Sequence, residues 1–349
     1  MKIETIKIII VAVFSFGCSL ATPALAGPKG TPSFYEICLN PSTDADRKTV
    51  EVMSWRAGFD LKSGDQGICA SVAESLKRIS YLKLHRDPFD PWWMITTLEP
   101  VGTQLHLRAL SASHNEISDL SPLGRLDDLR TLILWDNRVS DIAVLQKLKY
   151  LSRVTLTKNN IIDLHPISDL VAMREFAAAE NQIQSVEALR KLTKIDSLFL
   201  GHNQIESLEP LSALTAMTYL HLPGNRIKDL QPLGPMTTMR NLTLANNLIS
   251  ELAGIEKMAE IDALDLRGNQ ITRLSGLIGL KKLRWLDVRD NQIQDFSDLA
   301  DLQGLNDLKH LYVAGNPTAI IPASVLALRE EHLNSTGEWI QLEIDIFEN

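Results

Sequence analysis

The chain has 349 residues, 45% of them hydrophobic, and a formal net charge of -8 at pH 7. This acidic balance argues against nucleic acid as a partner, and no run of basic residues lies beside an aromatic platform anywhere in the sequence. A globular chain of this length would suggest two or three domains. A repeat array needs no such division, because it grows by adding copies of one unit.

Residues 1–26 are predicted to be a secretory signal peptide. Lys2 and Lys7 precede the apolar run IIIVAVFSF, and small residues end the segment, so cleavage is expected after Ala26. The apolar run is too short for a comfortable membrane span, and no later run is long enough. A lipoprotein cleavage before Cys18 is the alternative, but the usual leucine is missing ahead of it. The sequence therefore predicts an exported protein, free in the periplasm or outside the cell.

Residues 27–104 lack any repeat and are expected to form an N-terminal cap. Their apolar spacing predicts helices over Asp44–Ala57 and Ser71–Leu84. A cap is needed because the first coil of a repeat array would otherwise expose its apolar residues to water.

The aromatic segment PFDPWWMI follows these predicted helices. We expect Phe89, Trp92 and Trp93 to cover the first coil, at Leu107. The alternative is that the two tryptophans grip a sugar or a peptide.

Cleavage leaves two cysteines, Cys38 and Cys69, both ahead of the repeats. In an oxidising compartment such an isolated pair most simply forms a disulfide. A disulfide that closes a loop of about 30 residues would stabilise the fold by roughly 3 to 4 kcal/mol, because it restricts the conformations of the unfolded chain. Redox catalysis is not expected, because the sequence contains no CxxC spacing.

Residues 105–328 are predicted to contain about ten copies of one repeat. An asparagine recurs every 22 residues and finally after 25, at Asn115, Asn137, Asn159, Asn181, Asn203, Asn225, Asn247, Asn269, Asn291 and Asn316. The frame around it is LxxLxLxxNxIxxLxxLxxL, as in LRTLILWDNRVSDIAVLQKL. Its Leu-x-Leu part has the alternation of a strand, and the later apolar residues recur every third position, as in a 3₁₀ or extended turn. Stacked asparagines are expected to form a ladder that satisfies buried backbone groups.

This frame resembles the leucine-rich repeat family in its 22-residue bacterial form, familiar from the internalins. The half-repeat NxIxDLxPLxxL is matched by NEISDLSPLGRL and by NRIKDLQPLGPM. Prolines keep the same register at Pro122, Pro166, Pro210 and Pro232. The resemblance implies an α/β-type solenoid: a right-handed superhelix with a parallel β-sheet on its concave side, 3₁₀ or extended segments on its convex side and an N-terminal helical cap. Where Gly254 and Gly276 replace the proline, we expect only the outer turn to change.

The frame relaxes between Phe296 and Leu308, where an insertion lengthens one coil. Residues 329–349 are expected to form a C-terminal cap, with a capping helix predicted from PASVLALREEHL and a strand from EWIQLEIDIF. Too few residues follow the repeats for an immunoglobulin-like domain. That is a departure from the internalins, so host-cell adhesion is not carried over from them.

The side chains free to bind a partner are expected on the concave sheet. They stand six, four and two residues before each ladder asparagine, because side chains alternate between the faces of a strand. When neighbouring strands are aligned about 4.8 Å apart, two clusters emerge. The candidate residues are Phe199, Tyr219 and His221 in the middle; Trp285, His310 and Tyr312 near the C-terminal end, beside Asp265, Arg267, Asp287 and Arg289; and Trp135.

Aromatic and arginine side chains on a rigid exposed face are the usual anchors of protein interfaces. The sequence therefore predicts a secreted, monomeric protein that binds another protein without catalysis and without a cofactor. The simpler alternative is that the four charged residues form only a solvated ladder across the strands. Envelope glycan or peptidoglycan binding is a further alternative, because tryptophan and tyrosine faces beside carboxylates suit sugars.

An uncharacterised hydrolase is the enzymatic alternative, with His202, His221 or His310 as base and Asp265 and Asp287 as paired carboxylates. We do not favour it, because repetition by itself places the two aspartates in one column and no nucleophile accompanies them. No cysteine follows Cys69, which argues against the bacterial ubiquitin ligases that carry such repeats.

Metal binding is not expected either. Asp136, Asn137 and Asp141, or Asp290, Asn291 and Asp295, could suggest calcium. The asparagine of each set is committed to the ladder, however, and the later aspartate follows the repeat frame.

Overall fold

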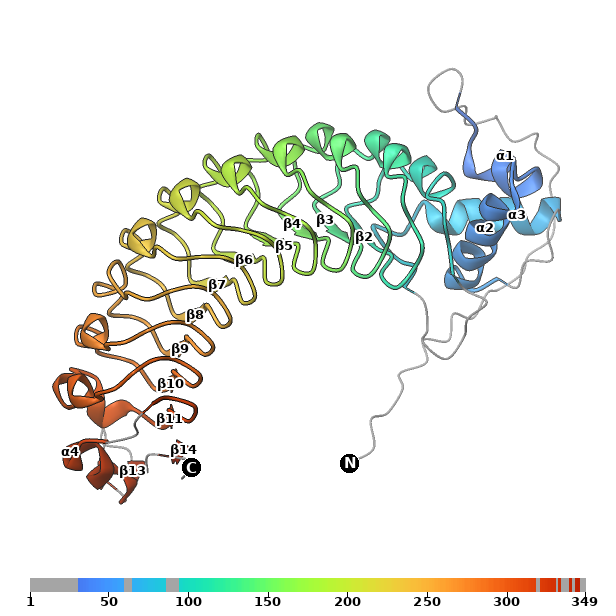
Figure 1. The fold of residues 1–349 in the computed structure, drawn as a ribbon. Coiled ribbons are helices and arrows are strands. Elements are labelled where there is room, and N and C mark those ends of the chain that lie inside the picture. The colour runs from blue at the N-terminus through green and yellow to red at the C-terminus, as the bar shows by residue number, and fades with distance from the viewer. Residues whose placement is uncertain are drawn as a thin grey trace.

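The computed structural model describes residues 31–59, 65–85, 94–317, 321–330, 332–333, 339–340 and 343–345. The predicted signal peptide, with Cys18 and Ala26, lies outside these residues, as do Phe89, Trp92 and Trp93. Figure 1 shows an arc with a group of helices at its N-terminal end. In the described part of the chain, no helix is long and apolar enough to cross a membrane.

The N-terminal helices are α1 (Phe34–Leu39), α2 (Asp44–Arg56) and α3 (Gln66–Leu76). Ser33, Thr43 and Asp65 cap them, each accepting a hydrogen bond from a backbone N–H of the first turn. A disulfide between Cys38 and Cys69 joins α1 to α3, with the Cα atoms 5.8 Å apart. This confirms the predicted pairing.

The predicted helix Asp44–Ala57 agrees with α2, whereas the predicted helix Ser71–Leu84 agrees with α3 only over residues 71–76. The helix ends at Leu76, and the chain then forms a strand, β1 (Tyr81–Lys83). Leu82 pairs with Leu110 of the first repeat and lies in the core. The sheet therefore begins inside the segment that the sequence assigned to the cap, because these residues bury their apolar side chains best as one more coil.

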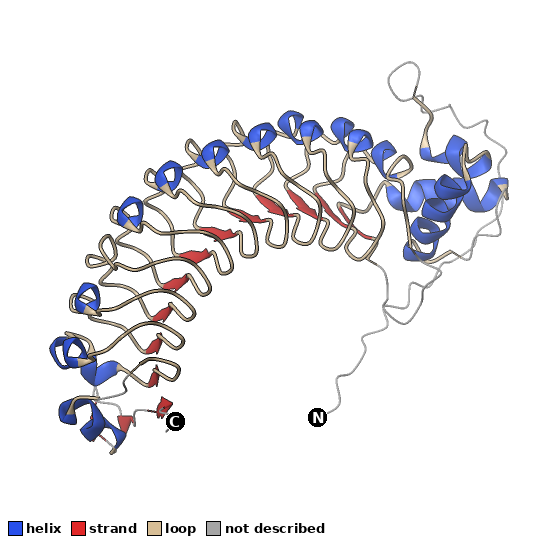
Figure 2. Ribbon diagram, in the orientation of Figure 1, coloured by secondary structure: helices blue, strands red, loops and turns tan. Residues whose placement is uncertain are grey.

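The described residues contain a twelve-stranded sheet in which every pairing is parallel and follows chain order from β1 to β11, ending on β14. The inner strands are β2 (Ala109–Ser111), β3 (Thr131–Ile133), β4 (Arg153–Thr155), β5 (Glu175–Ala177), β6 (Ser197–Phe199), β7 (Tyr219–His221), β8 (Asn241–Thr243), β9 (Ala263–Asp265), β10 (Trp285–Asp287) and β11 (His310–Tyr312). In Figures 1 and 2 these strands line the inner side of the arc. The parallel concave sheet expected from the repeat is confirmed.

Short 3₁₀ segments line the outer side of the arc (Figure 2). They are Val101–Thr103, Ser121–Arg125, Ala143–Lys147, His165–Ile167, Glu187–Leu189, Glu209–Leu211, Gln231–Leu233, Ser275–Leu277, Ser297–Asp301, Leu305–Asp307 and Ala327–Arg329. The coil that contains Gly254 has turns here and no 3₁₀ segment. Gly254 has a φ of +113°, which a residue with a Cβ rarely adopts. The coil of Gly276 keeps its 3₁₀ segment.

The core is a continuous column of leucine, isoleucine, valine and methionine side chains between the strands and the outer turns. In each strand from β1 to β11 the central residue is buried, and the neighbouring coils cover it. Burial of one such side chain contributes about 1.5 to 3 kcal/mol. Since one coil cannot bury its own residues, the coils are stable only as a stack.

The asparagines form a ladder along one edge of the core, and each is at most 9% exposed. Asn203 shows the pattern: its Nδ2 donates to the carbonyls of Leu200 in its own coil and Ala178 in the preceding one, both at 3.0 Å. Its Oδ1 accepts from the N–H of Ile183 at 2.9 Å. Each asparagine thereby ties two coils together through groups that would otherwise be buried without partners.

The C-terminal end departs in part from the prediction. The capping helix is shorter than PASVLALREEHL suggests: α4 (Ala323–Leu326) is followed by one 3₁₀ turn, and His332–Leu333 form β12. β12 pairs antiparallel with β13 (Trp339–Ile340), while β14 (Glu343–Asp345) pairs parallel with β11. The predicted strand in EWIQLEIDIF is therefore present as two short strands, and the insertion after Phe296 forms the second 3₁₀ turn of its coil.

Candidate functional site

The concave surface carries the residues that stand six and four positions before each ladder asparagine. Strand register places Trp285 opposite His310, and Asp287 between Asp265 and Tyr312. Likewise Phe199 lies opposite His221 and Ser197 opposite Tyr219. The two clusters that counting back from the asparagines predicts are therefore assembled on neighbouring strands.

The C-terminal cluster consists of Trp285, Arg289, His310 and Tyr312. The rings of Trp285 and Tyr312 have centroids 5.6 Å apart, and the Arg289 guanidinium carbon lies 5.0 Å from the Tyr312 ring centroid. The His310 ring is nearly parallel to that of Tyr312, with centroids 6.4 Å apart. His310 Nδ1 also lies 3.0 Å from a carboxylate oxygen of Glu343 in β14. All four side chains are half-buried, so they are ordered by contact yet still reach solvent.

Asp287 is not on the exposed surface, which corrects the sequence prediction. It is 1% exposed, because Trp285 and Arg289 flank it along its strand and Asp265 and Tyr312 flank it on the neighbouring strands. Both of its carboxylate oxygens accept from Arg289, at 2.9 Å from Nε and 2.5 Å from Nη2. The Asp287 carboxylate thus holds the Arg289 guanidinium in place, and this guanidinium contacts the Tyr312 ring.

Asp265 and Arg267 are half-buried neighbours on β9 and the loop that follows it. One carboxylate oxygen of Asp265 accepts from the Arg267 backbone N–H at 3.1 Å. The four charges do not form a solvated ladder across the strands: Asp287 and Arg289 pair within one strand and are largely out of water, and Asp265 has no matching pair with Arg267.

The middle cluster consists of Phe199, Tyr219 and His221. Phe199 and His221 have ring centroids 6.1 Å apart, and Tyr219 is 44% exposed. Burial lowers the pKa of His221, and the nearby charge of His202 lowers it further. His221 is therefore neutral at pH 7 and presents an uncharged, partly aromatic surface.

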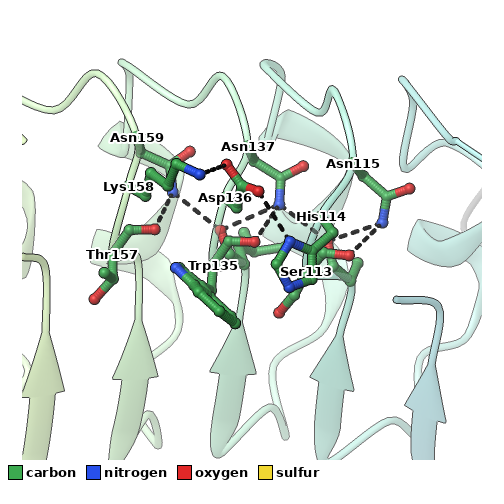
Figure 3. A network of polar contacts seen from close by, with 11 residues as sticks. Ser113, His114, Asn115, Trp135, Asp136, Asn137, Thr157, Lys158 and Asn159 are labelled. Carbon is green, nitrogen blue, oxygen red and sulfur yellow. Dashed lines mark hydrogen bonds and ion pairs between the residues drawn. The ribbon is translucent and has the colours of Figure 1, made fainter. Parts of the chain in front are cut away.

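A third group lies on the edge of the sheet near its N-terminal end. The sequence named Trp135 of this group as a binding residue and Asp136 only as a calcium candidate, and it did not predict the group itself. Figure 3 shows His114, Asp136 and Lys158 on three successive coils, each just before a ladder asparagine. His114 Nδ1 and Lys158 Nζ lie 2.9 Å and 3.0 Å from the two Asp136 carboxylate oxygens. Trp135, 42% exposed, packs its ring edge-on against His114 at 4.4 Å between centroids. His114 and Asp136 also line a shallow hollow of about 450 Å³ beside Met94, Glu116 and Arg138.

These three residues have positive φ values between 57° and 58°. The same left-handed position is held by glycine in other coils, as at Gly224 and Gly268. The signal that could have identified the position is the recurrence of His, Asp, Asn and Gly just before the ladder asparagine, since these residues tolerate left-handed backbone best.

Lowering the pH is expected to remove the contribution of Asp136 to stability. Burial acts to raise the pKa of Asp136, but hydrogen bonds from His114 and Lys158 outweigh it and hold the pKa below the ordinary 3.8. Because the folded-state pKa is depressed, this stabilisation is complete above the unfolded-state pKa and is lost as the pH falls through the folded value. Thermal midpoints of the wild type and Asp136→Asn should converge across that acidic range. The exposed Asp128→Asn is the control, and a gap between wild type and Asp136→Asn that does not change with pH would contradict the charge-based account.

The described ranges contain no group of three or more His, Cys, Asp or Glu side chains placed to hold a metal ion. Of the aspartates that could have suggested calcium, Asp141 and Asp295 accept from backbone N–H groups two residues later, and Asp136 is held by His114 and Lys158. These contacts give each carboxylate a structural role.

Comparison with known proteins agrees with the architecture. The leucine rich repeat family model matches residues 237–293. No curated protein matches the sequence. An internalin F structure from Listeria monocytogenes has 24% identity and a TM-score of 0.66, covering 92% of this chain and 99% of that one.

Two further structures are similar. The functional domain of internalin J from Listeria monocytogenes has 23% identity and a TM-score of 0.59, over 68% of this chain and 50% of that one. A plant peptide hormone receptor, RGFR1, in complex with RGF2 has 18% identity and a TM-score of 0.59, over 80% of this chain and 49% of that one. At these identities the likeness shows the fold alone. The asparagine-centred frame, the parallel concave sheet and these matches together make the chain a leucine-rich repeat protein with the internalin type of fold.

Proposed function

We propose that this chain is an exported recognition protein that binds a partner protein through its concave sheet, without catalysis. Its predicted signal peptide and its Cys38–Cys69 disulfide both suit an oxidising compartment. We assign residues 27–104 to the N-terminal cap, 105–328 to the repeats and 329–349 to the C-terminal cap, and we expect the protein to act as a monomer.

The observation that carries the proposal is the contact chain Asp287–Arg289–Tyr312–Trp285 on the concave side. Interface hot spots are enriched in tryptophan, tyrosine and arginine, and side chains already held in place lose little entropy on binding. The sheet is also long enough: its ten strands β2 to β11, about 4.8 Å apart, span roughly 45 Å, which accommodates an interface of standard size.

The binding residues of the proposal are the half-buried or exposed concave side chains. They are Trp135, Phe199, Tyr219, His221, Asp265, Arg267, Trp285, Arg289, His310 and Tyr312. The plant peptide hormone receptor that shares this fold is likewise in complex with another molecule, RGF2.

Replacing both Trp285 and Tyr312 with alanine is expected to abolish partner binding, with a loss of about 2 kcal/mol or more per residue as for interface hot spots. The wild type is used to capture partners from surface extracts, and the partners are identified and purified. Calorimetry then measures their affinity for the wild type and for the double variant. The thermal midpoint should stay close to the wild-type value, since neither side chain belongs to the leucine core.

Tyr150→Ala is the matched control, because Tyr150 is 59% exposed but lies in the turn before β4, outside the concave columns. A large drop in the midpoint of the double variant would make the pair structural and remove the evidence for an interface there. If a glycan array captured the wild type while no protein did, the glycan-binding alternative would replace the proposal.

A further inference from the structure

Two aspartates occupy equivalent concave positions on neighbouring strands, but only one has a cation. Asp287 and Asp265 are direct partners in the register of β10 and β9. Asp287 receives three contacts from the Arg289 side chain, at 2.9, 3.1 and 2.5 Å. Asp265 receives a backbone N–H from Arg267 at 3.1 Å, and no cation in the described ranges lies within ion-pair distance of it. One carboxylate is therefore saturated by this chain, and the other retains acceptor capacity.

The surroundings of Asp265 make its ionised carboxylate unfavourable for the stability of the free protein. Burial raises the pKa of Asp265, and the charge of Asp287 adds to this effect, while the Arg267 backbone hydrogen bond and the charges of Arg267 and Arg289 oppose it. No other charged group faces Asp265 from the adjacent strands, since β8 places Thr243 beside it. An ionised carboxylate that is partly withdrawn from water without an ion pair destabilises the free protein. Residues that cost stability in this way are characteristic of binding sites.

The surroundings define what could complete the pairing. Strands β8 and β9 carry the short side chains of Thr243 and Ala263 next to Asp265. Trp285 stands on the adjacent strand β10, and Tyr219 stands on β7, two strands away on the other side. A lysine or arginine side chain suits this arrangement, because its apolar stem packs on aromatic rings while its charged end reaches a carboxylate.

We propose that Asp265 is the recognition point for a lysine or arginine side chain of the partner protein, inserted between the aromatic residues of β7 and β10. This inference rests on the proposed function, and it assigns that function a partner with a basic contact surface. The net charge of -8 favours the same choice, because complementary charge speeds encounter and excludes acidic partners.

The test pans a phage-displayed library of random peptides on the wild type and on three variants. Wild-type selection is expected to enrich peptides with a lysine or arginine at one fixed position. Asp265→Asn should bind the selected synthetic peptides about ten-fold or more weakly, as for truncation of one partner in a partly buried charge pair. The exposed Asp169→Asn, which changes the net charge equally, should bind them as the wild type does.

Two further readouts separate binding from folding. Peptide affinity should fall with decreasing pH as Asp265 takes up its proton, earlier than for an ordinary aspartate, and Asp265→Asn should lose this dependence. The thermal midpoint of Asp265→Asn at neutral pH should equal or exceed that of the wild type, because the substitution removes a desolvated charge and keeps an acceptor for the Arg267 N–H.

The outcomes distinguish the two proposals. If the selected peptides require Trp285 and Tyr312 but carry no fixed basic residue, or bind Asp265→Asn undiminished, the inference fails and the proposed function stands. If the Trp285→Ala, Tyr312→Ala double variant enriches the same peptides, or if no peptide is enriched at all, the proposed function fails and the inference with it. A lowered midpoint of Asp265→Asn would give Asp265 a structural role and overturn the inference.

Discussion

Leu200→Asp is expected to abolish cooperative unfolding of the repeat array at its centre. Leu200 is fully buried in the column of leucines that runs between the coils. A carboxylate there would be ionised without a partner or would have to take up a proton, and either state costs several kcal/mol on top of the lost leucine packing. We expect the free energy of unfolding to fall by more than about 4 kcal/mol. Urea titration monitored by circular dichroism measures this loss.

The matched control is Ser197→Asp, which places the same carboxylate in β6, just before Leu200, where Ser197 is half-buried on the concave side. It should stay within about 1 kcal/mol of the wild type, as surface substitutions do. Similar losses in both variants would contradict the assignment of the two faces, and with it the placement of the concave columns.

The assignment of the faces was predictable from the sequence because two periodicities agree. The Leu-x-Leu alternation fixes which side chains enter the core, and the asparagine fixes the register, so the alignment of Trp285 with His310 follows by counting. The first strand carries the same signal: Leu82 and Leu84 flank Lys83 in a Leu-x-Leu segment. The helical spacing of Val72, Leu76 and Ile79 continues to Leu82, however, so the same leucine fits both a helix and a strand, and the spacing alone predicts too long a helix.

The burial of Asp287 could not be predicted by counting residues back from the ladder asparagine. Strand alternation places it on the concave side, but its burial depends on how Arg289, Trp285 and Tyr312 fold over it, which is a matter of side-chain packing between three elements. The position of Asp265 outside any ion pair could not be predicted either, because it depends on the pairing of Arg289 with Asp287. The column of candidate residues was therefore predictable, whereas the difference between its two carboxylates was not.

The edge network of His114, Asp136 and Lys158 lies one residue beyond the strand alternation that the sequence analysis used. Their left-handed backbone turns these side chains toward the neighbouring coils, as Figure 3 shows. A hydrophobic pattern carries no information about such a position, because none of its residues enters the core. Only the choice of residue types at that position reports the backbone conformation.

Asn203→Ala is expected to lower the free energy of unfolding by about 3 kcal/mol or more, although it removes only a small polar group. The substitution leaves the buried Ile183 N–H without its acceptor. It also removes one of the two asparagine donors at each of the Ala178 and Leu200 carbonyls, which keep their bonds from Asn181 and Asn225. The unsatisfied N–H costs about 1 to 3 kcal/mol, and each hydrogen bond lost at a carbonyl costs about 0.5 to 1.5 kcal/mol more. Asn160→Ala is the control, because Asn160 is exposed just beyond the ladder and should be nearly neutral.

Asn203→Asp separates the two halves of the interaction. The carboxylate can still accept from the Ile183 N–H, but its second oxygen would face the carbonyls of Ala178 and Leu200, where the native amide donates. We therefore expect Asn203→Asp to be at least as damaging as Asn203→Ala at neutral pH and to recover in part as the carboxyl is protonated at acidic pH. If both variants unfolded at the wild-type urea concentration, the ladder would contribute nothing to the coupling of coils, and its regular spacing would need another physical explanation.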